Sequence, residues 1–251
     1  DLLSLLDLEK EDFVALFTRA LQLKKRYNRG ILDKLLAGKS LGLIFDKKST
    51  RTRVAFETAM IQLGGHPIYM SAQDTQISRN EPAKDTARVL SRYIDCLAMR
   101  TFDHSLVEEF AQNSTIPVIN ALTDSFHPCQ ILSDIMTIIE HKGGYKNLKI
   151  AWVGDGNNVV NSWINAASVI GLDLVVACPD NYGVNHHIIE AALVKNKNNI
   201  VFTNDPKEAV KNADVVYTDV WASMGDENEL SKRIIAFKGF QVNKDLLSRA
   251  K

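Results

Sequence analysis

The sequence predicts an α/β protein with two domains, each a parallel sheet flanked by helices, joined by an interdomain helix. Short β-rich runs alternate with helical patterns along nearly the whole chain, which is typical of βαβ units. These runs form two groups, and a long amphipathic helix separates them. With 251 residues and 45% hydrophobic content, the chain is long enough to bury a core in each domain.

The expected strands are short runs rich in β-branched and other apolar residues. In the first half they span 41–45, 67–70, 96–100 and 117–122. In the second half they span 149–154, 173–179, 200–204 and 214–219. Because helical stretches separate consecutive strands, each half is expected to form its own parallel sheet.

The helix between the two groups spans the sequence HPCQILSDIMTIIEHKGG, which ends in a glycine pair typical of a helix stop. Its isoleucines are spaced for a single buried face. These are Ile131, Ile135, Ile138 and Ile139. The predicted domains are therefore 1–127 and 143–251, with the joining helix over 128–142.

Composition excludes several classes of partner. Thirty basic residues balance thirty acidic ones, so no overall charge favours nucleic acid or an anionic membrane. No apolar segment is long enough to span a bilayer, and residues 1–13 are acidic and amphipathic, unlike a targeting peptide. Cys96, Cys129 and Cys178 are scattered without metal-type spacing. We expect a soluble cytoplasmic protein without a metal, or a mitochondrial matrix protein if a transit peptide precedes this sequence.

The stretch FDKKSTRTR, residues 45–53, places four cationic side chains and three hydroxyls directly after an expected strand. Apolar residues then recur at helical spacing until Gly64 and Gly65, so the cations lie where a strand becomes a helix. A helix N-terminus offers free N–H groups and a partial positive charge to an anion. Arg51 or Arg53 can add two parallel hydrogen bonds to a phosphate. The turn therefore predicts a phosphate site.

The alternative interpretation of this turn is a solvated basic face with Ser49 as the helix cap. It accounts for Lys47 and Lys48, but not for the Arg-Thr-Arg sequence directly behind the cap. The Walker A pattern is missing from the stretch, which argues against nucleotide hydrolysis.

Several motifs together resemble the carbamoyltransferase family. STRTR at 49–53, MRT at 99–101 and HPCQ at 127–130 follow in that family's order at the ends of expected strands. Further similar segments are LGGHP at 63–67, DTARVLS at 85–91 and VGDGNNV at 153–159. DVWASMG at 219–225 is similar to the loop that marks the ornithine-specific members. The resemblance covers essentially the whole chain.

The resemblance implies two substrates, carbamoyl phosphate and L-ornithine, and no cofactor or metal. It implies transfer of the carbamoyl group to the δ-amine of ornithine, which gives L-citrulline and phosphate. The implied phosphate ligands are Ser49, Thr50, Arg51 and Thr52. Arg100 and His127 would reach the carbonyl oxygen and Gln130 the carbamoyl amide, with Arg51, Arg100 and His127 as the catalytic groups. The residues implied to face ornithine are Asn158, Asp219, Ser223 and Met224.

Each assignment also has a structural alternative. His127 precedes a proline at a helix start, where a histidine can cap or pack. Asp219 can be a turn residue, Gln130 helix surface and Met224 a filler of the core. Arg100 closes an apolar strand, where an unpaired charge is costly, so a ligand or a carboxylate partner is expected.

The resembling family continues into a further strand with a His-Cys-Leu-Pro segment, whose cysteine helps to position the reacting amine, and into a final helix that returns to the first domain. The sequence stops at residues 245–251, DLLSRAK, without either. We expect that a C-terminal segment is omitted rather than absent, because stopping one strand early would leave a sheet edge uncovered. None of the three cysteines is assigned that role.

Three other functions stay open. A nicotinamide-dependent dehydrogenase would explain VGDGNNV after a strand, but Val159 stands where the fingerprint needs its third glycine. A carbamoyltransferase for putrescine, acetylornithine or aspartate would share the phosphate half, whereas the Ser-Met-Gly loop favours ornithine. A non-catalytic member of the fold is the third, because fold alone does not set function.

Residues 70–89 contain more polar residues than a simple turn needs. In the resembling family this region approaches the site of a neighbouring subunit, so we expect a homotrimer or a multiple of trimers. The resemblance also implies a place in arginine biosynthesis, the urea cycle or arginine catabolism.

Overall fold

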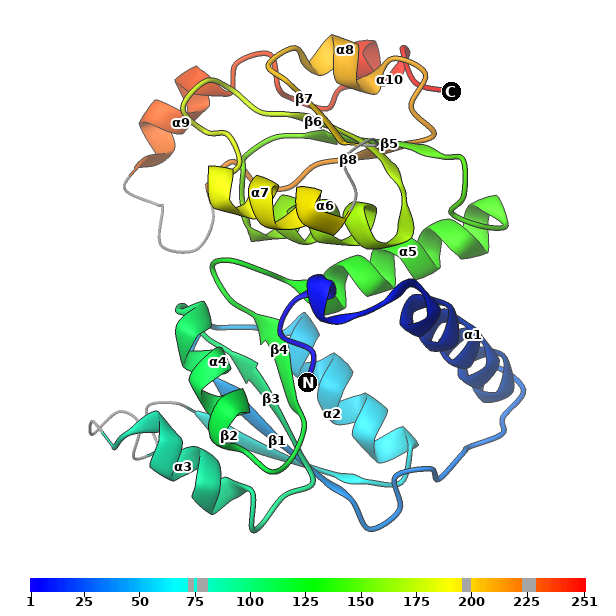
Figure 1. Ribbon diagram of the computed structural model, residues 1–251. Helices are drawn as coiled ribbons and strands as arrows, with labels where there is room; N and C mark the ends of the chain where they lie inside the picture. The colour runs from blue at the N-terminus through cyan, green and yellow to red at the C-terminus, as the bar shows by residue number, and fades with distance from the viewer. Residues whose placement is uncertain (72–74, 76–80, 196–199, 223–228) are drawn as a thin grey trace. The chain divides into compact units, whose positions relative to one another are not determined.

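The computed structural model describes residues 1–71, 75, 81–195, 200–222 and 229–251. The chain divides into two compact units, Asp1–Cys129 and Gln130–Lys251. Each unit contains its own parallel four-stranded sheet with helices on both faces (Figure 1). The predicted α/β class with two parallel sheets is therefore confirmed.

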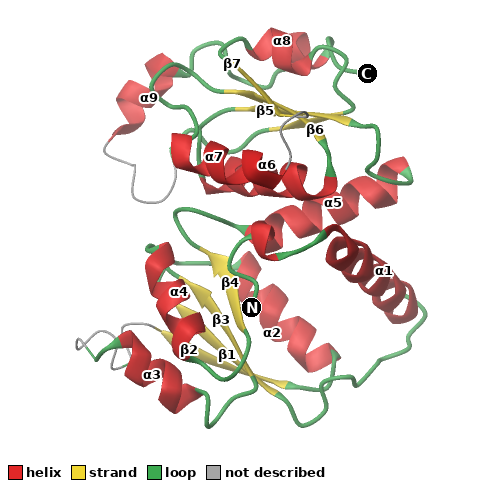
Figure 2. Ribbon diagram, viewed as in Figure 1, coloured by secondary structure: helices red, strands yellow, loops and turns green. Residues whose placement is uncertain are grey.

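The first unit alternates strands and helices as its sequence pattern predicts (Figure 2). Its strands are β1 Ser40–Phe45, β2 His66–Ser71, β3 Cys96–Arg100 and β4 Val118–Leu122. Its helices are the 3-10 turn η1 Leu5–Asp7 and the α-helices α1 Lys10–Tyr27, α2 Arg51–Gln62, α3 Ala83–Leu90 and α4 His104–Asn113. The strand order is β2-β1-β3-β4, and every pairing is parallel.

The core of the first unit lies on both faces of its sheet, because successive strand residues point to opposite sides. Leu41, Leu43 and Phe45 of β1 pack with Met60 of α2 on one face. On the other face Ile44 packs with buried residues of β3, α3 and α4. Both faces are covered, so these strands are nearly continuous apolar runs, as expected for a parallel sheet.

The second unit repeats this architecture. Its strands are β5 Lys149–Val153, β6 Asp173–Ala177, β7 Ile200–Thr203 and β8 Val215–Tyr217. Its first helix is α5 Pro128–Lys142, and the later ones are α6 Asn158–Ile170, α7 His186–Lys195, α8 Pro206–Val210, α9 Leu230–Ala236 and α10 Lys244–Leu247. The strand order is β7-β6-β5-β8, again parallel throughout. Helices α6 and α7 cover one face of the sheet, and α8 and α10 lie on the other (Figure 1).

Helix α5 spans Pro128–Lys142, as its isoleucine spacing predicts. Ile131, Ile135 and Ile138 are buried. The helix ends at Gly143, which has a φ of 77° and donates its N–H to the carbonyl of Ile139 at 2.9 Å. A left-handed conformation of this kind favours glycine, so the glycine pair stops the helix as expected.

All four strands of the second unit end earlier than predicted, β7 by one residue at Thr203. β5 stops before Gly154, which still donates its N–H to the Ala177 carbonyl of β6 at 3.0 Å and has a φ of 153°. β6 stops two residues before Pro179, which has no N–H to donate. β8 stops before Thr218, whose hydroxyl donates to the carbonyl of Val153 at 2.7 Å. Because each strand ends early, the residue that follows it belongs to the turn at the carboxyl edge of the sheet.

Both sheets reverse direction at an internal strand. The chain runs from β1 to β2 and then places β3 on the other side of β1. In the second unit it runs from β5 through β6 to β7 and then places β8 on the other side of β5. In open α/β sheets a ligand crevice forms at such a reversal, at the carboxyl ends of the two strands. The candidate sites are therefore the β1/β3 end in the first unit and the β5/β8 end in the second.

No helix within the described ranges combines the length and the apolar character that a membrane span needs.

Candidate active site

The predicted phosphate turn lies at the β1/β3 reversal of the first unit. Helix α2 begins at Arg51 behind Thr50, and no side chain caps it. Its first intrahelical bond runs from Val54 N–H to the Thr50 carbonyl at 3.0 Å, so the three preceding N–H groups have no acceptor within the helix. The alternative in which Ser49 caps this helix is wrong, since Thr50 is the cap residue and makes no capping bond.

Arg100 closes β3 and is only 7% exposed. The register between β3 and β4 shifts at Arg100, and such a bulge re-aims the strand's last side chain. Its guanidinium makes two long contacts, from Nη1 to Thr52 Oγ1 at 3.4 Å and from Nη2 to the Lys48 carbonyl at 3.5 Å. Its Nε has no acceptor within the described residues. Burial and the neighbouring charge of Arg51 both lower the pKa of Arg100, so this cation lies next to another cation rather than a carboxylate.

His127 follows β4 and is buried. Burial, with a smaller effect from the charge of Arg100, lowers the pKa of His127 to about 4. The imidazole is therefore neutral near pH 7 and keeps one N–H donor. The preceding turn is fixed by two bonds, from Thr123 N–H to the Phe126 carbonyl at 2.9 Å and from Phe126 N–H to Thr123 Oγ1 at 3.2 Å.

Arg51, Arg100 and His127 thus come from three separate segments of the first unit and interact electrostatically. The structure brings them together beside the uncapped start of α2. Two guanidinium groups for which the described residues show no carboxylate partner, a neutral imidazole donor and backbone N–H groups without an acceptor in the helix favour an anion with several oxygens, such as a phosphate ester.

Arg53 is excluded as the alternative phosphate arginine. Its Nε donates to Glu57 Oε1 at 2.9 Å, and its guanidinium carbon lies 3.4 Å from the centre of the Tyr69 ring. Both contacts turn the side chain along its own helix and onto β2. Arg51 is exposed and directly starts the helix, so it is the arginine of this turn that stays available.

Lys47 is not part of a solvated face, so that part of the alternative interpretation is wrong. It is 6% exposed, forms an ion pair with Asp124, and its Nζ lies 4.4 Å from the centre of the Phe102 ring. Asp124 belongs to the turn that leads into His127. The ion pair therefore ties the turn after β1 to the turn after β4. Only Lys48 is exposed, as the alternative expected.

Gln130 lies in the first turn of α5, three residues after His127. The chain divides into its two units just before it. Its Nε2 donates to Asp134 Oδ1 at 3.0 Å, so it is engaged by its own helix rather than being free helix surface.

The β5/β8 reversal of the second unit brings Asp219 next to the start of α6. Asn157 caps α6, since its Oδ1 accepts from the N–H groups of Val159 at 3.0 Å and Val160 at 3.3 Å. Its Nδ2 donates to Asp219 Oδ2 at 3.1 Å, and Val220 N–H donates to Asp219 Oδ1 at 2.8 Å. The sequence interpretation missed Asn157, although an asparagine before a helix is a cap signal that could have identified it.

Asn158, the predicted neighbour of Asp219, is the first residue of α6 and is half-buried. Ser223 and Met224 lie outside the described residues, so their predicted roles stay predictions.

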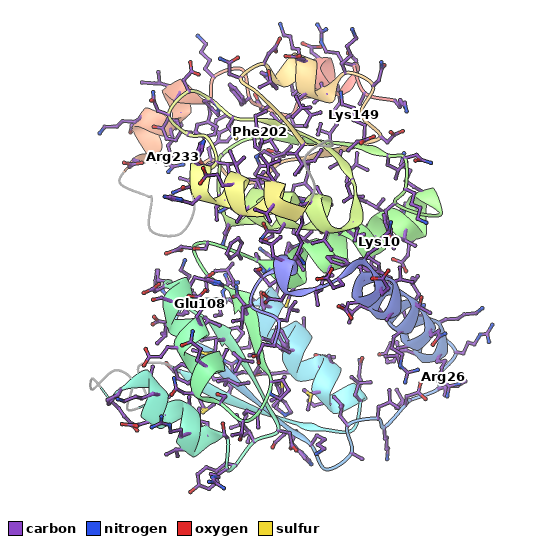
Figure 3. All side chains as sticks on the ribbon, viewed as in Figure 1. Lys10, Arg26, Glu108, Lys149, Phe202 and Arg233 are labelled. Atoms are coloured by element: carbon purple, nitrogen blue, oxygen red, sulfur yellow. The ribbon has the colours of Figure 1, made fainter. Side chains whose placement is uncertain are left out.

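A buried ion pair supports the segment that carries Asp219. Arg233 of α9 is 8% exposed, and its Nη1 donates to Asp155 Oδ2 at 2.8 Å and to the Trp221 carbonyl at 2.9 Å (Figure 3). Asp155 follows β5, and Trp221 follows Asp219 by two residues. The pair therefore joins both strand ends of this reversal to α9. Sequence reasoning did not identify it, because its two charges are 78 residues apart.

The glycine turn after β5 does not suit a dinucleotide. A Cβ on Gly156 would lie 2.4 Å from the backbone carbon of Gly183, and Gly156 N–H donates to the Tyr182 carbonyl at 2.9 Å. The second glycine of the fingerprint normally lets the backbone approach a pyrophosphate. Here the close approach is to the chain itself, which removes the main argument for the dehydrogenase.

The cysteines are not reactive thiolates. Burial raises the pKa of Cys129 and of Cys178 to about 12, and it also raises the pKa of Cys96. All three are free. Their thiols stay protonated at neutral pH and are poor nucleophiles.

Comparison with known families covers both units. Residues 1–140 match the family model of the "Aspartate/ornithine carbamoyltransferase, carbamoyl-P binding domain", and residues 146–251 match the "Aspartate/ornithine carbamoyltransferase, Asp/Orn binding domain". An ornithine carbamoyltransferase of Syntrophus aciditrophicus is 53% identical over 251 residues, which is 100% of this chain and 83% of that protein. One of Archaeoglobus fulgidus is 49% identical over 250 residues and is covered to 81%.

Solved structures agree with the sequence relatives. The ornithine carbamoyltransferase of Pyrococcus furiosus superposes with a TM-score of 0.95 at 48% identity, over 100% of this chain and 81% of that one. The anabolic ornithine carbamoyltransferase of Campylobacter jejuni gives a TM-score of 0.92 at 42% identity, over 99% and 82% of the two chains. The chain described here belongs to the aspartate/ornithine carbamoyltransferase family.

Proposed function

We propose that the protein transfers the carbamoyl group of carbamoyl phosphate to the δ-amine of L-ornithine, giving L-citrulline and phosphate. The observation that carries the proposal is the carboxylate-free group of Arg51, Arg100 and His127 beside an uncapped helix start, in a chain of this family. A phosphate monoester with an adjacent carbonyl satisfies both the cations and the neutral donor.

Carbamoyl phosphate is assigned to the first unit. Its phosphate would accept from the backbone and hydroxyl groups at the start of α2 and from one guanidinium. These groups belong to Ser49, Thr50, Arg51 and Thr52. Arg100 and His127 would donate to the carbonyl oxygen, and Gln130 would meet the carbamoyl NH2. The burial of Arg100 without a carboxylate supports this, because an anion would compensate a charge that is otherwise costly.

Ornithine is assigned to the second unit. Asp219 would accept from the α-ammonium group, and Asn158 would donate to the α-carboxylate. The two bonds that hold the Asp219 carboxylate support a fixed position for it. By resemblance, Ser223 and Met224 would complete this site.

The reaction follows from the assigned groups. The neutral δ-amine attacks the carbonyl carbon, an oxyanion develops on the carbonyl oxygen, and the bond from carbon to the phosphate oxygen then breaks. The amine loses a proton, and the departing phosphate keeps the bonding electron pair. Fixed donors aimed at the oxyanion and the leaving phosphate lower the barrier, which is the role assigned to Arg51, Arg100 and His127. No enzyme nucleophile takes part.

The domain roles and the assembly are proposals as well. We assign carbamoyl phosphate to residues 1–127, ornithine to 143–251 and the joining helix to 128–142. We also propose a homotrimer or a multiple of trimers, to which residues 70–89 contribute. Most of the loop in that region, 72–74 and 76–80, lies outside the described residues. Light scattering at working concentration tests this, and a monomer would contradict it.

A cytoplasmic location is supported by the balanced charge and by three free cysteines.

The activity is tested by measuring citrulline from carbamoyl phosphate and ornithine. Parallel reactions with putrescine, acetylornithine and aspartate provide the acceptor controls. We expect citrulline formation with ornithine to exceed carbamoylation of every other acceptor by about 100-fold or more, because a site that reads both an ammonium and a carboxylate discriminates strongly. A preference for another acceptor would overturn the assignment of the second unit, and no turnover with any acceptor would favour a non-catalytic member.

A further inference from the structure

Three polar side chains of the second unit form a connected hydrogen-bonded group around Asp134. Gln130 and Asp134 lie one turn apart in α5, and Tyr217 is the last residue of β8. Gln130 Nε2 donates to Asp134 Oδ1 at 3.0 Å, and the Tyr217 hydroxyl donates to Asp134 Oδ2 at 2.8 Å. Each carboxylate oxygen therefore accepts one bond from a different element.

The chemistry of this group fixes which way the Gln130 amide points. An ionised carboxylate only accepts hydrogen bonds, so Gln130 must turn its NH2 group and not its oxygen toward Asp134. The other end of the amide, Oε1, takes no part in the bond to Asp134. Gln130 thus presents a hydrogen-bond acceptor, with its orientation set by a neighbour.

Tyr217 in turn holds Asp134 in place. Its ring stacks on Trp152, with ring centres 5.5 Å apart and planes 19° apart, and meets the edge of Trp163 at 5.6 Å. Burial raises the pKa of Tyr217, so the hydroxyl stays a donor at neutral pH. Burial also raises the pKa of Asp134, while the bonds from Tyr217 and Gln130 oppose that rise.

We propose that Asp134, anchored by Tyr217, is a positioning residue that presents Gln130 Oε1 to the NH2 group of the carbamoyl substrate. The inference rests on the proposed function, in which Gln130 meets that NH2. The positioning would explain how the site distinguishes carbamoyl phosphate from other acyl phosphates. The NH2 group of carbamoyl phosphate can donate to Gln130 Oε1, whereas a methyl group or an oxygen in its place cannot. A site built around an acceptor rejects an analogue that lacks the donor.

The test uses two stable phosphonates that differ at one group. Phosphonoacetamide carries a carbonyl and an NH2, and phosphonoacetate carries an oxygen in place of that NH2. Inorganic phosphate serves as a third probe, because it meets only the phosphate turn. Dissociation constants of all three are measured by calorimetry for the wild type and for Asp134→Asn, whose new amide can donate to Gln130 Oε1 and turn the Gln130 NH2 outward.

We expect Asp134→Asn to lower the preference for the amide over the acid by about tenfold, since one favourable hydrogen bond is exchanged for a donor–donor clash. Inorganic phosphate should bind the variant with an unchanged dissociation constant. Asp214→Asn is the matched control, because Asp214 directly precedes β8 and accepts from Lys149 N–H at 2.9 Å, whereas Tyr217 is at the other end of that strand. It should leave the preference for the amide unaltered.

Three further variants distinguish a failure of the proposed function from a failure of the positioning role. Gln130→Ala should abolish the preference for the amide, and adding Asp134→Asn to it should change nothing more, because Asp134 acts through Gln130. If Gln130→Ala keeps the wild-type preference, the assigned role of Gln130 in the proposed function is wrong. If Gln130→Ala loses the preference but Asp134→Asn keeps it, only the positioning role is wrong. Tyr217→Phe retains the stacking and should weaken phosphonoacetamide binding alone, so unchanged binding would remove Tyr217 from the proposal.

Discussion

Replacing Arg100 by methionine should make the unliganded protein more stable while removing its response to phosphate. Arg100 is 7% exposed, has no carboxylate partner in the described part of the first unit, and its best contacts are 3.4 and 3.5 Å long. Taking an ion out of water costs several kcal/mol even after relaxation, and these contacts and the repulsion by Arg51 return little of it. Methionine fills a similar volume without a charge.

The expected gain is about 1–2 kcal/mol in the free energy of unfolding of Arg100→Met without ligand, within the range seen when buried charges are replaced by apolar residues. Added phosphate should reverse the order of stability of the wild type and Arg100→Met. A ligand at 100 times its dissociation constant stabilises the folded state by about 2.7 kcal/mol, and the variant should lose most of this because the anion then lacks its buried partner. The wild type should therefore be the less stable protein without phosphate and the more stable one with it.

The assay is urea unfolding of both proteins with and without inorganic phosphate, at constant ionic strength set with chloride. Arg92→Met is the control, because Arg92 is an exposed arginine of the same unit and its loss should change stability by less than about 0.5 kcal/mol. Destabilisation of unliganded Arg100→Met by more than about 1 kcal/mol would mean that the protein itself compensates the Arg100 charge. An undiminished phosphate response would mean that the anion binds elsewhere.

The remaining predictions concern both units. Arg51→Ala should weaken carbamoyl phosphate binding about tenfold or more in calorimetry, whereas Arg53→Ala should not, because Arg53 is bound to its own helix. Folding lowers the pKa of His127 from 6.5 to about 4, so its imidazole binds a proton more readily in the unfolded chain than in the folded protein. It should therefore contribute about 3 kcal/mol of stability that is complete above pH 6.5 and lost as the pH falls to 4, and urea titrations of His127→Gln should show this slope reduced. Asp219→Asn should raise the KM for ornithine about tenfold and leave that for carbamoyl phosphate unchanged; equal effects on both would contradict the assigned roles. Asn157→Ser keeps a cap for α6 but loses the bond to Asp219, so it should raise the ornithine KM without a large change in Tm.

The sequence determined the elements and the place of the cationic turn at the start of α2. Short runs of apolar and β-branched residues located all eight strands, because a strand buried in a parallel sheet needs apolar residues on both faces. The Arg-Thr-Arg sequence after β1 located the helix start, since cations directly behind a strand-to-helix turn are otherwise unfavourable at the positive end of a helix. Both signals are local, so each can be read within about ten residues.

The exact limits of strands were less predictable. The sequence pattern predicted strands that include Gly154 and Thr218, yet β5 and β8 end just before these residues. Whether a residue at a strand end pairs depends on its neighbour strand, and that neighbour is distant in sequence.

The partners of the polar side chains were decided only by the tertiary structure. Lys47 pairs with Asp124, 77 residues away, and is thereby withdrawn from the basic turn that its sequence position suggests. Tyr217 reaches Asp134 over 83 residues of sequence, and Gln130 donates its Nε2 to the same carboxylate. A residue's own type fixes what it can donate or accept, but the partner it meets depends on which strand ends and helices the fold brings together.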